Sequence, residues 1–382
     1  MIDEIREGAP AERALTNWAR RARYAGSKDR AAVRDHVYDV IRRWRSCGAL
    51  GGGAEARALV IGLLRGQGVD PDEIFTGEGY APPPLSKAER AAGYAPRADE
   101  ARDLPDWLWL RFQASLGAEA GEAAETLRHR APVTLRVNAR RMSRDAAQVA
   151  LADEGILCQP VNHVKMALQV IEGSRKISSS PLYLSGAIEL QDASSQAAME
   201  TLELQPRSRV LDYCAGGGGK TLALAARVEG EWFAHDVSMR RMSDLPARAA
   251  RAGAEVRLCE TQELHRLGPY DAVLCDVPCS GSGTWRRGPQ AKWDLTPEDL
   301  VDLSLVQGEI LAQASALVAP GGQLIYCTCS VLCEENECVI QRFSRNVPGW
   351  HWMAPKRWLI SEAGDGFFLA QLFRERSDFY QP

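Results

Sequence analysis

The spacing of apolar residues changes along this chain and divides it into regions. In the first 70 residues apolar side chains recur at helical spacing, namely Leu15, Trp18 and Ala22, then Val33, Val37 and Ile41. Glycines at 26, 48 and 51–53 follow these segments and predict where the helices end. The segment 77–97 is rich in Pro, Gly and Ala, which is typical of a linker, and "LPDWLWLRFQASLG" then predicts a further helix.

The pattern after residue 130 first predicts a small mixed module. A short β-branched run in "APVTLRVN" precedes "SRDAAQVALADEG", which predicts a helix with Ser143 as its N-cap and Gly155 as its stop. From about residue 191, short apolar strands alternate with glycine turns and helices. This alternation predicts an α/β domain with a mostly parallel sheet and helices on both faces.

Four regions follow from these patterns. We expect a helical region at 1–75, a linker with helices at 76–128, a small α+β module at 129–190 and the α/β domain at 191–382. The composition, with 45% hydrophobic and 25% charged residues, is that of an ordinary globular protein.

The chain shows no sign of export or of membrane insertion. Its start has no basic segment followed by an apolar run, and the most apolar stretch, 58–64, is too short to span a bilayer. We therefore expect a cytoplasmic protein without membrane contact, whose ten cysteines are free thiols or ligands rather than disulfides.

Basic residues are concentrated near the amino terminus, although the net charge is −4. Residues 18–45 hold nine Lys/Arg against three Asp/Glu. Such a block is either a solvated helix face or a surface that contacts phosphates.

A glycine-rich loop follows one predicted strand, in "VLDYCAGGGGKT". Glycines allow close approach of the backbone to a ligand, and the N–H groups at the start of the next helix favour an anionic or polar group. The spacing is neither that of a P-loop nor a clean G-x-G-x-x-G. Asp236 ends the next strand, 20 residues after Gly216, where an acid binds ribose hydroxyls or caps a helix. Up to this point, NAD and S-adenosylmethionine (AdoMet) are equally good candidates for the cofactor.

A carboxylate and a thiol follow another predicted strand, in "YDAVLCDVPCSGSGTW". Asp276 and Cys279 would lie at the carboxyl edge of the sheet, near the cofactor. Amino-methyltransferases often carry an Asp-Pro-Pro-aromatic turn here, and "DVPC" has no aromatic residue. An amino-methyltransferase is therefore disfavoured.

Four cysteines lie within residues 325–338, "IYCTCSVLCEENEC". The strand "QLIYCTCS", after the turn "APGG", places Ile325, Cys327 and Cys329 on one face, so Cys329 emerges at the same rim as Cys279. The spacing lacks the Cys-x₂-Cys pairs of structural zinc and no histidine is near, so we predict no metal site. "CEENEC" reads as the start of an acidic helix.

Two thiols and a carboxylate beside AdoMet suit methylation of cytosine C5. A thiolate added to C6 makes C5 nucleophilic, a carboxyl group can hold the N3/N4 edge, and a base must then remove the C5 proton. The residues by themselves leave open which of Cys279 and Cys329 attacks.

These stretches resemble the RsmB/NSUN class of AdoMet-dependent RNA cytosine-C5 methyltransferases, in particular its bacterial Fmu/RsmB-like members. The similarity lies in "RALTNWARRARYAGSKDRAAVRDHVY", "APVTLRVN", "GAIELQDASSQ", "DYCAGGGGKT", "HDVSMRR", "DVPCSGSGT", "YCTCS…EEN" and "DGFFLAQL". The resemblance implies a Rossmann-like class I methyltransferase domain, a NusB-like helical RNA-binding region that is shorter than a complete one, and a module similar to an RNA-recognition domain.

The resemblance also implies roles for particular residues. Cys329 matches the nucleophile, Cys279 the cysteine that assists product release, and Asp276 the acid that orients the cytosine. Lys220 matches the lysine that closes the cofactor loop near the active site. The implied cofactor-binding set is Cys214, Ala215, Gly216, Gly217, Gly218, Gly219, Lys220, Asp236, Arg241, Glu260 and Asp276.

Two departures from the family pattern concern the cofactor. The loop usually reads Cys-Ala-Ala-Pro-Gly-Gly-Lys, and Gly216 and Gly217 stand here in place of the alanine and proline. We expect a looser loop and weaker cofactor binding. Glu260 stands where an aspartate near the adenine is common.

The sequence thus predicts a monomeric RNA (cytosine-5)-methyltransferase that uses AdoMet, with ribosomal RNA as substrate, transfer RNA as the alternative, and no role on DNA. The predicted RNA contacts are the basic amino-terminal helices together with Arg136, Arg286, Arg287 and Lys292. The competing hypothesis is an RNA-binding assembly factor that has lost turnover, although a protein freed from catalysis has no need for both thiols.

Overall fold

The computed structural model describes residues 1–375, which form two compact units. The first unit contains Met1–Arg130 and Trp285–Thr296, and the second contains Ala131–Thr284 and the chain from Pro297 onward. Within the described residues no single helix has the length and apolar composition to cross a membrane, although α4 (Trp44–Gly51) and α5 (Ala56–Gly66), bent by 94° at the break between them, pass that test as a pair.

The first unit is helical. Its elements are α1 (Ile2–Arg6), α2 (Ala11–Arg21), α3 (Ser27–Arg42), α4 (Trp44–Gly51), α5 (Ala56–Gly66), α6 (Pro71–Ile74), α7 (Lys87–Ala91), α8 (Ala98–Ala101), α9 (Asp106–Leu116), the 3₁₀ turn η1 (Gly117–Glu119), α10 (Ala120–Leu127) and α17 (Ala291–Asp294). The helical spacing of apolar residues is confirmed in α2 and α3, but the chain breaks at Arg43 between α3 and α4.

Close backbone contact between α4 and α5 explains part of the glycine-rich sequence of this region. A Cβ atom at Gly51 would lie 1.9 Å from the Ala58 carbonyl oxygen, and one at Gly62 would lie 1.9 Å from that of Cys47. Only glycine permits two helices to approach so closely at these positions.

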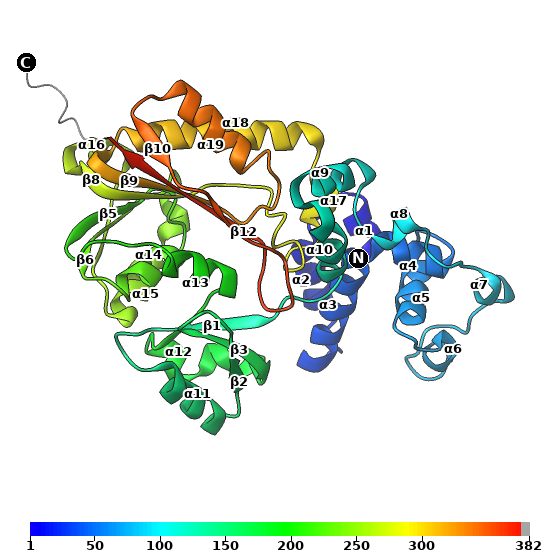
Figure 1. The fold of residues 1–382 in the computed structure, drawn as a ribbon. Helices are drawn as coiled ribbons and strands as arrows, with labels where there is room; N and C mark the ends of the chain where they lie inside the picture. Colours follow the sequence, from blue (N-terminus) through cyan, green and yellow to red (C-terminus); the bar gives the residue numbers. More distant parts are fainter. Residues whose placement is uncertain (376–382) are drawn as a thin grey trace, which may run out of the picture. The chain divides into compact units, whose positions relative to one another are not determined.

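One segment of the predicted α/β domain belongs to the helical unit instead. Trp285 stacks on Phe112 of α9 with ring centroids 5.8 Å apart, and Trp293 makes an edge contact with Trp44 of α4 at 6.2 Å. Figure 1 shows α17, in yellow, among the blue and cyan helices of this unit. The predicted 191–382 domain is therefore interrupted at 285–296, because these aromatic side chains, of which Trp285 is buried and Trp293 half-buried, pack against helices far away in sequence.

The second unit begins with a small antiparallel sheet in the order β2-β3-β1-β4. Its elements are β1 (Val133–Val137), α11 (Arg144–Asp153), β2 (Leu157–Pro160), β3 (Ala167–Glu172), η2 (Ser174–Ser179), α12 (Pro181–Leu184) and β4 (Ile188–Leu190). The predicted cap of α11 is confirmed, since the Ser143 hydroxyl accepts a hydrogen bond from the Ala146 amide and Gly155 follows the helix at φ +70°.

The larger sheet of this unit has the order β10-β12-β9-β8-β5-β6-β7, with β11 paired to β12. Its strands are β5 (Ser208–Asp212), β6 (Gly230–Ala234), β7 (Val256–Leu258), β8 (Tyr270–Asp276), β9 (Val318–Thr328), β10 (Trp350–Trp352), β11 (Lys356–Trp358) and β12 (Phe367–Arg374). The strands from β9 to β7 are parallel, whereas β12 and its partners are antiparallel.

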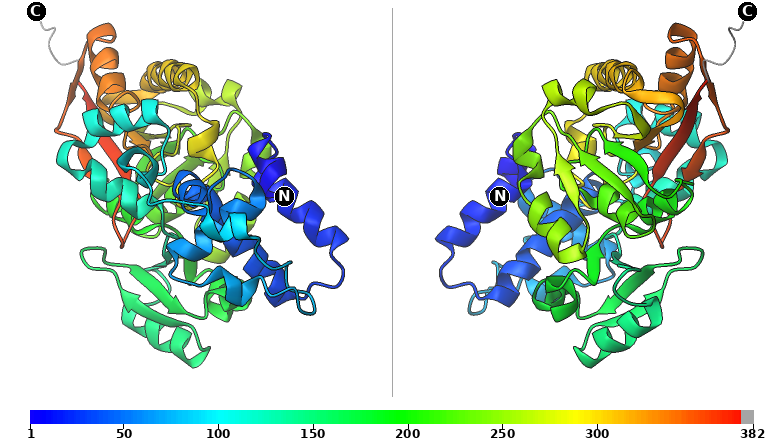
Figure 2. Two further views of the ribbon diagram at one scale, coloured as in Figure 1. Left: turned by 90° about the vertical axis from the view of Figure 1, so that its right-hand side faces the viewer. Right: turned by 90° about the vertical axis from the view of Figure 1, so that its left-hand side faces the viewer.

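Helices cover both faces of this sheet, as predicted (Figure 1, Figure 2). They are α13 (Ala193–Glu200), α14 (Gly219–Ala225), η3 (Met239–Met242), α15 (Leu245–Ala252), η4 (Thr261–Glu263), α16 (Leu264–Leu267), α18 (Pro297–Ser315) and α19 (Glu337–Asn346). Apolar residues of α18 and α19 bury one face, and those of α13 and α14 bury the other.

The strand β9 shows both agreement with the sequence pattern and two corrections. Tyr326 packs in the core under α18 and α19, whereas Ile325 and Cys327 pack on the opposite face, as alternation predicts. The "APGG" stretch is not a turn before the strand but an irregularity within it, because Tyr270 pairs with Val318 and Ala272 with Gln323. The acidic helix begins only at Glu337, after a turn at 333–336.

Candidate active site

The thiol pair lies at the carboxyl edge of the larger sheet. β8 ends at Asp276, which leads into the loop with Cys279, and β9 ends at Thr328, next to Cys329. Parallel neighbouring strands bring these ends together, and the two sulfur atoms lie 3.4 Å apart. The structure thus brings together the two cysteines that the sequence singled out, which are 50 residues apart in the chain.

The two thiols have opposite electrostatic environments. The hydrogen bond from Cys279 lowers the pKa of Cys329, helped by the positive charge of Lys220 and by the Thr284 hydroxyl, against the opposing effects of burial and of the Asp276 charge. The pKa of Cys279 is raised well above its usual value, first by the hydrogen bond to Cys329 and then by burial. Of the two thiols, Cys329 is therefore the one that ionises more readily.

An ion pair lies beside the thiols. Lys220 Nζ is 2.5 Å from Asp276 Oδ2, and both side chains are partly buried. Burial disfavours the ammonium form, but the negative charge of Asp276 outweighs it and raises the pKa of Lys220. Lys220 thus keeps its charge next to the Asp276 carboxylate and close to the Cys329 sulfur.

The glycine loop is held by two arginines outside it. Gly216 adopts φ +49° and Gly218 φ +75°, conformations that glycine adopts without strain. Arg248 donates to the carbonyl oxygen of Gly217, and Arg136 donates to that of Gly219 at 2.7 Å. These bonds brace the loop in a way that the sequence pattern did not reveal.

Glu189 and Gln191 bind the two arginines that hold the glycine loop, and Glu189 belongs to the small antiparallel sheet. Arg248 pairs with Glu189 at 2.9 Å, and Arg136 donates to Gln191 Oε1 at 2.6 Å. Because Glu189 lies in β4, the small module takes part in holding the cofactor loop.

Asp212 is a site residue that the sequence reasoning missed. It ends β5, and its Oδ2 accepts a hydrogen bond from the Thr221 hydroxyl at 2.6 Å. The other oxygen, Oδ1, is buried and has no hydrogen-bond partner. Burial raises the pKa of Asp212 to about 7, with the Asp276 charge adding to the rise and the Thr221 bond opposing it. Its place at the strand end before the glycine loop was the available sequence signal.

The acid after β6 is bonded both to the glycine loop and to the turn that precedes η3. Asp236 is buried; its Oδ2 accepts a bond from the Gly216 amide at 3.1 Å and pairs with Arg241 at 3.3 Å. Its Oδ1 accepts from the Ser238 amide at 3.0 Å, just before η3. Asp236 thus links the glycine loop to the following turn, beside the strongly exposed Val237, an apolar side chain that the sequence reasoning also missed.

These groups fit a nucleoside-bearing sulfonium cofactor such as AdoMet. The unpartnered Asp212 oxygen suits an ammonium group, the glycine loop admits close approach, and Asp236 lies where ribose hydroxyls are held in this fold. The other predicted members of the set are arranged around them. Cys214 and Ala215 lead into the glycine loop, and Glu260 is exposed at the start of η4.

Three of the four single residues predicted to contact RNA are buried, which corrects that prediction. Arg136, Arg286 and Lys292 expose 7%, 1% and 1% of their surface, whereas Arg287 is exposed. Lys292 donates to the Arg42 carbonyl oxygen at 2.8 Å, and burial lowers the pKa of its ammonium group to about 7. These side chains organise the interior and are not on a surface that RNA can reach.

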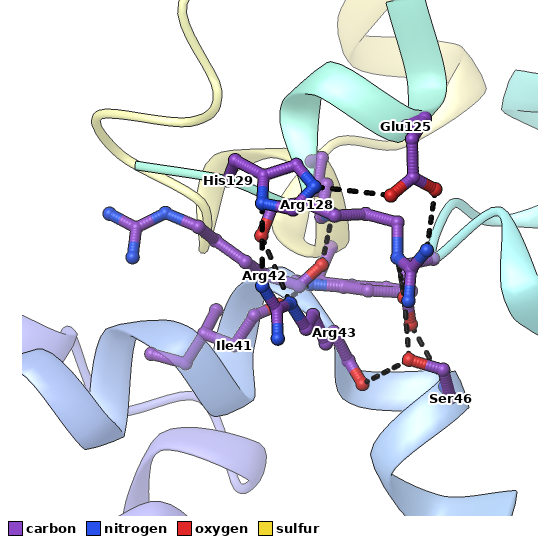
Figure 3. Close-up of polar contacts among 10 residues, drawn as sticks. Ile41, Arg42, Arg43, Ser46, Glu125, Arg128 and His129 are labelled. Carbon is purple, nitrogen blue, oxygen red and sulfur yellow. Dashed lines mark hydrogen bonds and ion pairs between the residues drawn. The ribbon is translucent and has the colours of Figure 1, made fainter. Parts of the chain in front are cut away.

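Part of the basic amino-terminal block is also internal. Arg42 is buried and donates to the Arg286 carbonyl oxygen at 2.8 Å. Arg43 donates to the Arg128 carbonyl oxygen at 3.2 Å, and Arg128 in turn pairs with Glu125 (Figure 3). The exposed basic positions of the block lie earlier, at Arg20, Arg21, Arg23, Lys28, Arg30 and Arg34.

All ten cysteines are free thiols. Within residues 1–375, no group of three or more His, Cys, Asp and Glu side chains is arranged to hold a metal ion.

A parallel sheet with a glycine loop, an acid after the second strand and reactive groups at its carboxyl edge is typical of Rossmann-like enzymes that bind a nucleoside-bearing cofactor. The family model described as "16S rRNA methyltransferase RsmB/F" matches residues 199–373, and the ferredoxin-like domain of the same family matches residues 104–176. Ribosomal RNA small subunit methyltransferase B of Citrobacter koseri is 33% identical over 72% of this chain and 68% of that protein. The same-named protein of Xylella fastidiosa is 32% identical over 72% and 67%. The chain belongs to the RsmB/F family of RNA methyltransferases.

Solved structures share the fold of this chain. A methyltransferase homolog from Pyrococcus horikoshii is 27% identical with a TM-score of 0.60, covering 69% of this chain and 93% of that one. The protein PH0851, at 22% identity, has the same fold over 97% of this chain and 96% of that one, with a TM-score of 0.74. NSun6 from P. horikoshii, whose structure contains the AdoMet analogue SFG, is 18% identical over 72% of this chain and 99% of that one, with a TM-score of 0.63.

Proposed function

We propose that this protein is an RNA (cytosine-5)-methyltransferase that takes its methyl group from AdoMet and forms a covalent bond between Cys329 and cytosine C6. The observation that carries the proposal is the Cys279–Cys329 pair, 3.4 Å apart at the cofactor edge, with a lowered pKa at Cys329 and a raised one at Cys279. The relatives named ribosomal RNA small subunit methyltransferase B support ribosomal RNA of the small subunit as the substrate.

Cys329 begins the reaction as the nucleophile. Its thiolate forms a bond to C6, and the electron pair of the C5–C6 double bond moves toward C5. The Asp276 carboxyl group faces the N3/N4 edge and offsets the charge that develops on the ring. AdoMet would supply the methyl group to C5 and leave as the neutral thioether once its methyl–sulfur bond breaks. Lys220 keeps Asp276 in place through their ion pair.

Cys279 completes the reaction as the base. The main cause of its raised pKa is the bond to Cys329, and that cause disappears once the Cys329 sulfur is bonded to carbon. Cys279 can then release its own proton to solvent, and the resulting thiolate accepts the C5 proton. The electron pair of the C5–H bond re-forms the C5–C6 double bond, and Cys329 leaves as a thiolate.

Binding of the cofactor involves residues at the ends of two neighbouring strands, β5 and β6. Asp212 would hold the ammonium group through its free oxygen, Asp236 the ribose hydroxyls, and Val237 would lie against the adenine. RNA would be contacted by Arg287 and by the exposed basic side chains of α2, α3 and the loop between them, since these remain accessible.

The test uses Cys329→Ala and Cys279→Ala with AdoMet and RNA from cells that lack the enzyme. Cys329→Ala is expected to lose both methylation and the protein–RNA adduct, whereas Cys279→Ala should accumulate the adduct. The reverse pattern would make Cys279 the nucleophile. Separate incubations with small-subunit ribosomal RNA and with transfer RNA decide between the two substrates, and full activity in both variants would refute the thiol mechanism.

The alternative of an inactive assembly factor is tested by calorimetry. A protein that only binds RNA would show RNA affinity without AdoMet affinity. The methyltransferase is expected to bind AdoMet with a 1:1 stoichiometry.

A further inference from the structure

A buried carboxylate lies behind the thiol pair and is not part of the mechanism above. Glu335, in the turn before α19, exposes none of its surface. Its carboxylate accepts four hydrogen bonds: from the Ser280 amide at 2.7 Å, the Ser280 hydroxyl at 2.5 Å, the Ser330 hydroxyl at 2.5 Å and the Gln307 side-chain amide at 3.0 Å. A buried carboxylate is tolerated when donors surround it in this way.

The donors connect the two loops that carry the reactive thiols. Ser280 directly follows Cys279, and Ser330 directly follows Cys329. One carboxylate therefore bridges the residue after each thiol.

Gln307 extends this connection to the other side of Cys279. Its side-chain amide donates both to Glu335 and to the Pro278 carbonyl oxygen at 2.9 Å. Residues 278 and 280 are thus both held by the same group of side chains, which leaves Cys279 little freedom to move relative to Cys329.

We propose that Glu335 is a positioning residue that fixes Cys279 against Cys329 by binding the Ser280 and Ser330 side chains together. The inference rests on the proposed function, because it assigns a purpose to the close approach of the two thiols. The sulfur atoms are 3.4 Å apart, so a displacement of about 1 Å would weaken their hydrogen bond severely.

The chemical requirement is for a charged acceptor. Glu335→Gln keeps the size of the side chain but replaces one oxygen by an NH₂ group that faces O–H and N–H donors. If the NH₂ group takes the place of Oε2, the Ser280 and Ser330 hydroxyls lose the acceptor that they share, and if it takes the place of Oε1, the Ser280 amide and Gln307 lose theirs. The bonds from Ser282 to Ser330 and from Gly283 to Cys329 still join the two loops, but Cys279 is held less firmly. Cys329 would lose the bond that favours its thiolate, while the cofactor loop would be unaffected.

The experiment compares Glu335→Gln with Glu334→Gln, which makes the same change at the neighbouring, half-exposed residue, and with Glu335→Asp, which keeps the charge. The apparent pKa of Cys329 is measured from the pH dependence of its alkylation by iodoacetamide, followed at this residue by mass spectrometry. Methylation kinetics and AdoMet binding by calorimetry are measured on the same proteins.

For Glu335→Gln we expect a rise in the Cys329 pKa of about one unit or more and a fall in kcat of about tenfold or more, with AdoMet affinity unchanged. Glu334→Gln should match the wild type, and Glu335→Asp should recover part of kcat. A Glu335→Gln protein that keeps the wild-type Cys329 pKa would overturn the inference even if it is less stable. If the Glu335→Gln protein does not fold, the Cys329 pKa of Glu335→Asp is the test instead. A shorter side chain cannot reach all four donors, so an unchanged Cys329 pKa in Glu335→Asp would contradict the positioning role.

The same measurements distinguish a failure of the proposed function from a failure of the positioning role of Glu335. If wild-type Cys329 titrates like an ordinary thiol and forms no adduct with RNA, the mechanism itself is wrong. If the wild type shows a low pKa and an adduct, and Glu335→Gln shows the same, only the positioning role of Glu335 is refuted.

Discussion

Asp212→Asn should make the protein without cofactor more stable at neutral pH while weakening its binding of AdoMet. The Asp212 pKa is raised from 3.8 to about 7, mainly by burial. The folded state therefore binds this proton more tightly than the unfolded state, and the free energy of unfolding falls as pH rises between these two values. At about 1.36 kcal/mol per pKa unit, the full cost of the charged form is about 4 kcal/mol above pH 7.

The pH dependence isolates this effect from other changes caused by the substitution. The difference in unfolding free energy between Asp212→Asn and the wild type should grow in favour of the variant by about 3 kcal/mol from pH 5 to pH 8. Urea unfolding at several pH values measures it, with the exposed Asp302→Asn on α18 as the matched control, which should show no such growth.

Calorimetry supplies the second half of this test. Asp212→Asn is expected to bind AdoMet at least about tenfold more weakly, since a neutral amide cannot pair with the ammonium group. A stability difference that does not change between pH 5 and pH 8 would refute the raised pKa. Unchanged AdoMet affinity would refute the role of the free oxygen.

Three further predictions concern other parts of the structure. Gly283→Ala should lower the free energy of unfolding by about 1–3 kcal/mol in urea titrations, because its Cβ would lie 2.4 Å from the Gly366 carbonyl oxygen, whereas Gly288→Ala, with open space around it, should have little effect. Gly217→Ala should weaken AdoMet binding in calorimetry, because its Cβ would lie 2.8 Å from the Arg248 guanidinium, and should weaken it less when Arg248→Met is already present. The Lys292 pKa is lowered to about 7, so the wild-type unfolding free energy should rise by about 1.4 kcal/mol per pH unit between about pH 7.5 and 9.5, and Lys292→Met should abolish this rise.

The sequence by itself determined most of the secondary-structure elements that carry the site and the types of reactive side chain in it. Alternation along "QLIYCTCS" placed Cys327 and Cys329 on the face opposite Tyr326, because successive side chains of a strand point to opposite sides whatever packs there. Parallel strands end at one edge, which put Asp276, Cys279 and Cys329 at a common rim before any contact was known. These are local or topological rules, and both can be applied to a linear sequence.

Tertiary structure decided what each charged group does. Arg136, Arg286 and Lys292 look like solvent-exposed basic residues in the sequence, and only their neighbours from distant segments show that they are buried. The segment 285–296 likewise joins the helical unit through Trp285 and Trp293, whose partners lie more than 100 residues earlier.

Which of the two thiols ionises more readily also depends on groups that are distant in the sequence. Apart from the family resemblance, the two cysteines, 50 residues apart, are equally good candidates in the sequence. The lowered pKa of Cys329 arises from the Cys279 hydrogen bond, the nearby Lys220 charge and the Thr284 hydroxyl, which only the folded chain brings together. The unpartnered oxygen of Asp212 is also visible only after every neighbour is placed. Burial and electrostatic effects are sums over groups brought together from across the chain, so the folded structure alone determines them.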